Sequence, residues 1–104
     1  MTDLDKQNDL LRAKLNQETA RMPWRELQKY FAGGAVIGVS PELDLVEVAV
    51  RIANDDKAAV AQWMAENRIA KVCDAQALAW WDADMQLWAV VIKPWILVQP
   101  PKPS

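Results

Sequence analysis

The sequence contains no histidine and a single cysteine, Cys73. Histidine is the commonest general base and a frequent metal ligand, so its absence removes the usual routes to acid–base catalysis and zinc binding. One cysteine cannot form a disulfide within the chain, and it offers no metal-ligand spacing. Because no histidine can activate Cys73, we expect it to be a buried, unreactive thiol. We expect no catalytic, cofactor-binding or metal-binding residues.

Two acidic pairs, Asp55-Asp56 and Asp82 with Asp84, are the remaining candidates for chemistry. Paired carboxylates can exchange protons or bind divalent metal ions, but both functions need acids that converge from several segments. Both pairs fall at the ends of predicted helices, where helix capping and turn formation already account for them. We therefore predict that the protein is not an enzyme, and a metal- or carboxylate-dependent enzyme is the weakest alternative.

Positive charge is also scarce. The 12 lysine and arginine residues stand against 14 aspartate and glutamate residues, so the net charge is −2. DNA, RNA and anionic membranes are held mainly through basic surface charge. The apolar run LWAVVI (87–92) ends at Lys93-Pro94, whereas a membrane-spanning helix needs about 20 apolar residues. The first residues are polar and contain no apolar export segment. We expect a soluble, cytoplasmic protein that does not enter membranes.

Glycine is limited to three residues, and no linker rich in proline or glycine divides the chain. A chain of 104 residues is near the commonest domain size. We predict a single domain over 1–104, with frayed ends at about 1–7 and 100–104. The adjacent Gly33 and Gly34 follow an apolar helical face, so they predict a helix end rather than a phosphate-binding loop.

Apolar spacing and capping residues predict four or five helices. The first runs from Asn8 or Asp9 to about Arg21. The second starts at Pro23, a good first helical residue, and carries Trp24, Leu27 and Phe31 on one face. A third helix is predicted at about 41–53. A fourth is predicted at about 55–67, with Val60, Trp63 and Met64 facing inward and Asn67 ending it in the left-handed conformation. A fifth runs from Asp74 to a turn at 82–84, with Leu78 and Trp81 on one face.

The segment VEVAVRI (46–52) fits two patterns. Its β-branched residues alternate with other residues, as in a strand, whereas Asp44, Glu47 and Arg51 mark the polar stripe of a helix. The preceding stretch, Ser40-Pro41-Glu42, offers an N-cap, a proline at the first helical position and acid in the first turn. We therefore favour a helix, in which Glu47 and Arg51 form an ion pair one turn apart.

Strands are predicted at 36–39, at 69–72 and within LWAVVIKPWILVQP (87–100). The last segment is apolar almost throughout, which indicates a strand covered on both faces. Lys93-Pro94 disfavours a two-residue hairpin, because the favoured hairpin turns need a positive φ that proline cannot adopt. We expect one long bent strand, or two strands in different pairings. The predicted fold is α+β, with a small mixed or antiparallel sheet and an order of elements similar to that of a winged helix–turn–helix domain.

Several segments resemble a known family. They are MPWRELQKYFAGG, LDLVEVAV, VAQWM and, above all, LWAVVIKPWILVQ. Together they are similar to the bacterial family catalogued as domain of unknown function 2288, over roughly residues 10–99. The resemblance implies a small cytoplasmic bacterial protein. It implies no activity and no catalytic residues, because the family has none assigned.

Six tryptophans, at positions 24, 63, 80, 81, 88 and 95, stand out beside one tyrosine and one phenylalanine. Tryptophan is mostly a core residue, yet it is also enriched at interaction hot spots. Trp80 and Trp81 are adjacent, so on a helix one of them should be partly exposed.

The last strand offers a further expectation. If Pro94 bends it, 95–98 forms an apolar sheet edge of the kind that recruits another chain. We therefore predict a partner interface at Trp88, Trp95 and Leu97. The protein would be a protein-interaction or self-association module, either a homodimer or bound to an unidentified protein partner.

The winged-helix-like order leaves nucleic-acid binding as the main alternative, with the helix around 56–67 in the major groove. Its outward residues include Lys57, Gln62, Glu66 and Arg68, which do not make a basic face. We therefore expect no retardation of duplex DNA in a gel at moderate salt. A sequence-independent shift that weakens linearly with the logarithm of the salt concentration would favour the winged-helix function instead.

Overall fold

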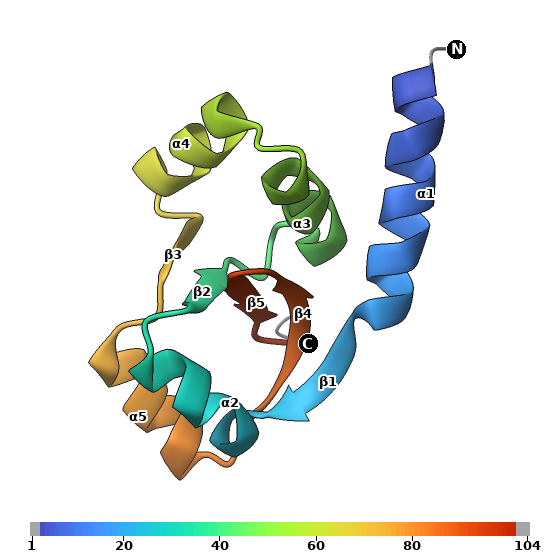
Figure 1. Cartoon of the computed structure of the whole chain (residues 1–104). Helices are drawn as coiled ribbons and strands as arrows, with labels where there is room; N and C mark the ends of the chain where they lie inside the picture. The colour runs from blue at the N-terminus through green and yellow to red at the C-terminus, as the bar shows by residue number, and fades with distance from the viewer. Residues whose placement is uncertain (1–2, 102–104) are drawn as a thin grey trace.

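The computed structural model describes residues 3–101 of the chain, and the side chains of residues 7–101. Its elements follow in the order α1 (Asp3–Glu18), β1 (Ala20–Pro23), α2 (Trp24–Ala32), β2 (Val36–Val39), α3 (Leu45–Ala53), α4 (Lys57–Ala65), β3 (Ile69–Lys71), α5 (Asp74–Asp82), β4 (Gln86–Ile92) and β5 (Trp95–Gln99) (Figure 1). The predicted α+β class is confirmed by the five helices and five strands of this part of the chain. None of these helices is long and apolar enough to cross a membrane.

The five strands form one mixed sheet in the order β1-β4-β5-β2-β3. β5 is antiparallel to β4 and parallel to β2, while β1 and β3 are antiparallel to their single neighbours. β5 is therefore the middle strand. The prediction that 95–98 forms an apolar edge is wrong, because strands on both sides already use the hydrogen-bonding groups of this segment.

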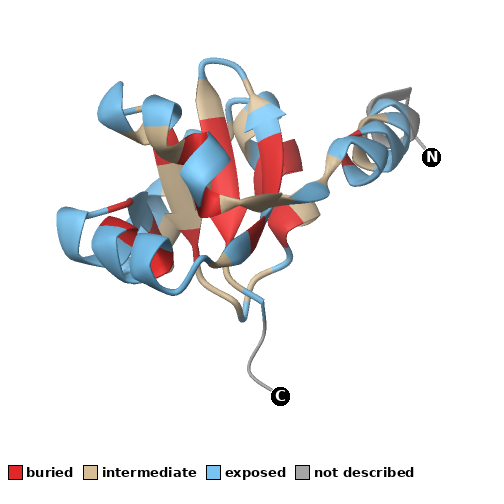
Figure 2. Ribbon diagram, turned by 90° about the horizontal axis from the view of Figure 1, so that it is seen from below, coloured by how far each residue is buried: buried red, intermediate tan, exposed pale blue. Residues whose placement is uncertain are grey.

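Helices cover both faces of the sheet. α2 and α5 pack on one face, around a core that includes Trp24, Leu87 and Ile96. α1, α3 and α4 lie on the other face, where Leu97 belongs to a core with Val48 of α3. Figure 2 shows the buried residues concentrated in the strands, while α1 stands out from the body and is mostly exposed. Successive residues of β5 thus supply two separate cores.

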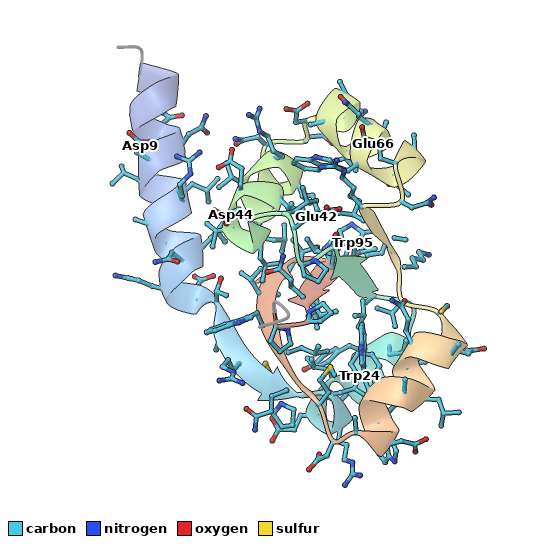
Figure 3. The ribbon with its side chains drawn as sticks, turned by 180° about the vertical axis from the view of Figure 1, so that it is seen from behind. Asp9, Trp24, Glu42, Asp44, Glu66 and Trp95 are labelled. Atoms are coloured by element: carbon cyan, nitrogen blue, oxygen red, sulfur yellow. The ribbon has the colours of Figure 1, made fainter. Side chains whose placement is uncertain are left out.

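Trp24, the first residue of α2, is fully buried, and its side chain faces α5 (Figure 3). Its ring packs in T-shaped geometry against Trp80 and Phe31, with centroid distances of 5.1 and 5.6 Å. Its indole N–H has no hydrogen-bond partner among the described residues. Of the adjacent tryptophans, Trp80 is therefore the core residue. Leu78 and Trp81, which were predicted to share a face, lie on the solvent side of α5, with exposed fractions of 62% and 40%.

The N-terminal segment differs from the prediction. α1 ends at Glu18 rather than near Arg21, and the next residues form β1, which pairs with β4. Thr19 closes the helix, because its backbone N–H and its hydroxyl both donate to the carbonyl of Leu15. Pro23 ends β1 and precedes the first residue of α2, so it is an N-cap and not the first helical residue. A four-residue edge strand carries too little alternation to be recognised in the sequence.

The ambiguous segment 46–52 is a helix, as predicted. Its N-cap, however, is Asp44 and not Ser40. The Asp44 carboxylate accepts hydrogen bonds from the second and third helical N–H groups at 3.0 and 3.3 Å, whereas Ser40 still extends the ladder of β2. The predicted ion pair is present, with 3.5 Å between Glu47 and Arg51.

β4 and β5 form a tight hairpin, which corrects the prediction that Lys93-Pro94 disfavours one. Ile92 and Trp95 are direct partners across the turn. The Lys93–Pro94 peptide bond is cis, and one class of β-turn contains a cis-proline at its third position. The connection is therefore not one of the favoured hairpin turns that need a positive φ.

Two further expectations about exposure are wrong. α4 is capped by Asp56 and followed by the left-handed Asn67 (φ 59°), as predicted, but Met64 is 54% exposed instead of facing inward. Cys73 is exposed instead of buried. It occupies the N-cap position of α5, at the surface end of that helix.

Gln99 ends β5 with its side chain buried. Its amide group donates to the backbone carbonyls of Ser40 and Leu43, at 2.8 and 2.6 Å. These two bonds attach the loop between β2 and α3 to the middle strand. They therefore help to set where α3 begins its path across the sheet.

We expect Gln99→Leu to lower the free energy of unfolding by about 1–3 kcal/mol, because two carbonyls lose their donor. The matched substitution Gln86→Leu, at an exposed position of β4, should change it by less than about 0.5 kcal/mol. Urea unfolding followed by circular dichroism measures both. Equal effects of the two substitutions would show that the bonds made by Gln99 do not stabilise the fold.

Candidate functional site: the Trp95 cavity

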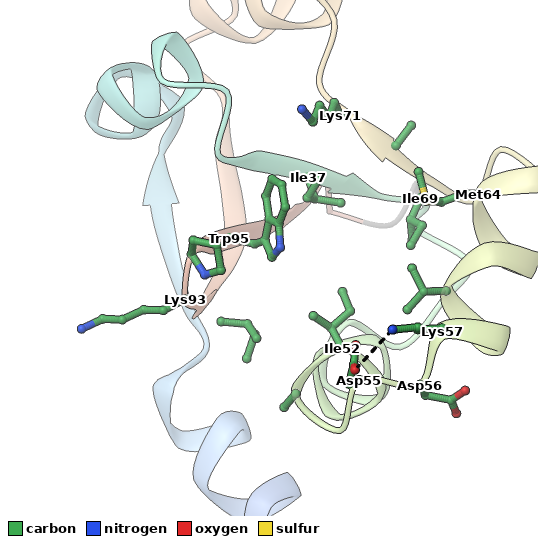
Figure 4. A pocket seen from close by; sticks show the side chains of 15 residues that line it. Ile37, Ile52, Asp55, Asp56, Lys57, Met64, Ile69, Lys71, Lys93 and Trp95 are labelled. Atoms are coloured by element: carbon green, nitrogen blue, oxygen red, sulfur yellow. Dashed lines mark ion pairs between the residues drawn. The ribbon is translucent and has the colours of Figure 1, made fainter.

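A cavity of about 460 Å³ lies on the α3–α4 side of the sheet, at the start of β5 (Figure 4). It is surrounded by β2, β3, the β4–β5 hairpin with its turn, the end of α3, the turn that follows α3, and α4. Its lining consists of the apolar residues Ile37, Ile52, Ala53, Val60, Met64, Ile69, Ala70, Ile92, Pro94 and Trp95 and the charged residues Asp55, Asp56, Lys57, Lys71 and Lys93. A pocket of this size with a mostly apolar lining is typical of a ligand-binding site.

The pairing of the strands places several side chains together on the sheet side of the cavity. Ile37 pairs with Lys71 across β2 and β3, and Ile92 pairs with Trp95 across the hairpin. Directly paired residues point their side chains to the same face of a sheet. α4 lies over this face, yet none of its residues is buried. The cavity is the space that α4 leaves between itself and the strands.

The two acidic side chains at the cavity are engaged in the turn between α3 and α4. Asp56 accepts a hydrogen bond from the N–H of Ala59 at 3.2 Å and forms an ion pair with Arg51 at 3.1 Å. Asp55 has a left-handed backbone (φ 56°) and lies 4.0 Å from the ammonium of Lys57. Their capping and turn roles match the interpretation drawn from the sequence.

Lys71 and Lys93 leave positive charge beside the cavity. Neither has a carboxylate within 4.0 Å among the described residues. The ammonium of Lys71 lies 5.7 Å from the centre of the Trp95 ring, a cation–π geometry that keeps it at the cavity wall. Lys93 points away from the cavity (Figure 4). The site therefore combines an apolar interior with one cation held against its aromatic wall.

The three residues predicted as a partner interface do not form one surface. Trp88, Trp95 and Leu97 share a face of the sheet, but Leu97 is 0% exposed and belongs to the core beneath α3. Trp88 is 40% exposed, with the guanidinium of Arg21 at 5.7 Å from its ring centre. Of the three, only Trp95 lines the cavity. Leu97 is not available to a partner in this fold.

Sequence reasoning missed the residues that surround Trp95, because they come from separate elements. A signal for one of them is present in IAKV (69–72). Lys71 follows Ile69 by two positions, so both side chains lie on the same face of a strand. A lysine on the apolar face of a short strand is typical of an edge that borders solvent.

A shallower groove lies between α2 and α5, where Trp81 is exposed. Arg25 lies over the Trp81 ring at 5.0 Å from its centre and donates to the Trp81 carbonyl at 3.2 Å. The same guanidinium is 3.6 Å from Asp84, one of the acidic residues considered for chemistry. Neither Arg25 nor Asp84 lines the groove, and its own lining, Gln28, Phe31, Asp74, Ala77, Leu78 and Trp81, contains no basic side chain.

Comparison with known proteins gives a family and a similar structure. The sequence profile of the family described as "Protein of unknown function (DUF2288)" matches residues 10–100. The NMR solution structure of PA1075 from Pseudomonas aeruginosa is similar, with 41% sequence identity and a TM-score of 0.80, covering 99% of this chain and 95% of that chain. No curated protein matches. Neither description names an activity or a ligand.

Proposed function

Because the chain belongs, as its motifs indicated, to a family whose description, Protein of unknown function (DUF2288), gives no activity, we propose its function from the geometry of its surface. It is a protein-interaction module and not an enzyme. The Trp95 cavity receives an apolar side chain from a partner segment that also carries a carboxylate. The observation that supports this most strongly is the apolar cavity next to Lys71. No carboxylate in the part of the chain that the structure describes lies within 4.0 Å of the Lys71 ammonium.

The apolar part of the proposal depends on Trp95. Tryptophan is enriched at interface hot spots, which lie in pockets that exclude water. Trp95 is only partly buried by its own chain, and its neighbours in the cavity are branched aliphatic side chains such as Ile37 and Ile92. Filling the cavity with a valine, leucine or isoleucine side chain would remove apolar surface from water and contribute about 1.5–3 kcal/mol.

The acidic part depends on Lys71. An exposed ion pair contributes about 1 kcal/mol or less, so a carboxylate near this ammonium adds little affinity. It does discriminate between partners, because a basic segment would meet like charge at the same place. Asp55 and Asp56 do not cancel this preference, since each already has a basic neighbour.

The occupant is a segment of another protein and not a second copy or a nucleic acid. Self-association was expected through an open edge at 95–98, and that segment is the middle strand. Binding to a phosphate backbone requires several basic side chains that act together. Of the three lysines that line the cavity, Lys57 lies beside Asp55 and Lys93 points away (Figure 4), which leaves Lys71 against the wall.

The test uses an acetylated, amidated peptide with the order threonine–glutamate–threonine–isoleucine–threonine and follows the isotope-labelled protein by NMR. We expect the indole N–H of Trp95 and the methyl groups of Ile37 and Ile92 to shift as peptide is added. A titration to about 5 mM detects a binding free energy of only about −3 kcal/mol. A peptide with lysine in place of glutamate should bind at least about threefold more weakly.

Two charge reversals provide the control. Lys71→Glu should weaken binding of the glutamate peptide about fivefold or more, the equivalent of about 1 kcal/mol. Lys29→Glu alters another lysine that lies beside an aromatic ring, 5.0 Å from the centre of Tyr30 on α2, and should leave binding unchanged. No response of Trp95 to the glutamate peptide, or equal effects of the two reversals, would contradict the proposal.

A further inference from the structure

β3 is the outermost strand of the sheet on the side of the cavity, and its hydrogen bonding leaves one edge open. The carbonyl of Arg68 accepts a bond from β2 at 2.8 Å, and the N–H of Val72 donates to β2 at 3.4 Å. In an antiparallel pair the backbone groups of alternate residues face the partner strand. Ala70 therefore also faces β2, whereas the N–H and C=O groups of Ile69 and Lys71 point away from the sheet.

The open edge and the cavity share these two residues. Ile69 and Lys71 both line the cavity with their side chains, while their backbone groups face outward. Figure 4 shows Ile69 and Met64 close together beside the end of α4, with Lys71 further along β3. A chain lying along β3 would thus meet free hydrogen-bonding groups and the mouth of the cavity together.

We propose, on the basis of the function above, that the partner segment joins the sheet as a sixth strand, antiparallel to β3. In strand addition, main-chain bonds give affinity and pockets for alternate side chains give specificity. Antiparallel pairing is the more stable arrangement per residue. The segment then places a carboxylate opposite Lys71 and, two residues later, an apolar side chain opposite Ile69 at the cavity. Its recognition pattern is acid, any residue, apolar residue.

A second copy of β3 does not fit this edge. Antiparallel pairing of two copies would set Lys71 opposite either Ile69 or another Lys71, and neither arrangement neutralises the ammonium. Short edge strands that carry lysine are a common protection against self-pairing. Charge complementarity therefore selects an acidic segment of a different protein.

The first test compares two peptides of identical composition on the unaltered protein. One has glutamate before isoleucine, as in the peptide above, and the other has the order threonine–isoleucine–threonine–glutamate–threonine. We expect the first to bind about fivefold more tightly, because only its order matches both cross-strand neighbours in an antiparallel pairing. Equal affinities overturn the sixth-strand inference and leave the cavity's function standing. Failure of both peptides to shift Trp95 overturns the proposed function itself.

The second test separates the backbone of Lys71 from its side chain. Lys71→Ala removes the ammonium and keeps the outward N–H, whereas Lys71→Pro removes both, at an edge position where proline is tolerated. We expect Lys71→Pro to bind the glutamate peptide about fivefold more weakly than Lys71→Ala. Equal binding by the two variants overturns the inference. Should Lys71→Pro not fold, the comparison of the two peptide orders still decides it.

Discussion

The strand β5 carries apolar side chains on both of its sides, and the rest of the molecule keeps both sides away from water. Ile96 and Val98 face α2 and α5, while Leu97 faces α3, and none of the three is more than 6% exposed. Each buried side chain of this kind contributes about 1.5–3 kcal/mol. Helices on both faces and strands on both edges are the arrangement that this strand requires. The mixed sheet follows, with β4 antiparallel on one side and β2 parallel on the other.

At the start of β5 the apolar side chains are only partly covered by helices, and the cavity is the result. α3 covers the part of the strand that contains Leu97. α4, with the sequence KAAVAQWMA, is rich in alanine and buries none of its residues. Only Lys57, Val60 and Met64 of α4 line the cavity, and Trp95 remains half-buried beside about 460 Å³ of space. The proposed binding function is thus a consequence of incomplete cover over an apolar strand.

Features that depend on neighbouring residues were predictable from the sequence. The cap at Asp56, the left-handed end at Asn67 and the choice of helix for 46–52 involve contacts within one or two turns. The position of 95–98 in the sheet was not predictable in this way, because it depends on pairing with β2, more than fifty residues earlier. For the site, the sequence indicated Trp95 as a contact residue, but through an apolar sheet edge at 95–98 that the structure does not contain. The cavity around it could not be foreseen, since residues of six separate elements and two turns line it.

Hydrogen exchange of the backbone amides, resolved residue by residue, tests the strand order most directly. We expect slow exchange throughout 96–98, because β5 has a hydrogen-bonded strand on each side. In β3 we expect slow exchange for Ala70 and fast exchange for Ile69 and Lys71, whose N–H groups face outward. Alternating protection within β5, or uniform protection across β3, would contradict a sheet in which β5 is the middle strand and β3 an open edge.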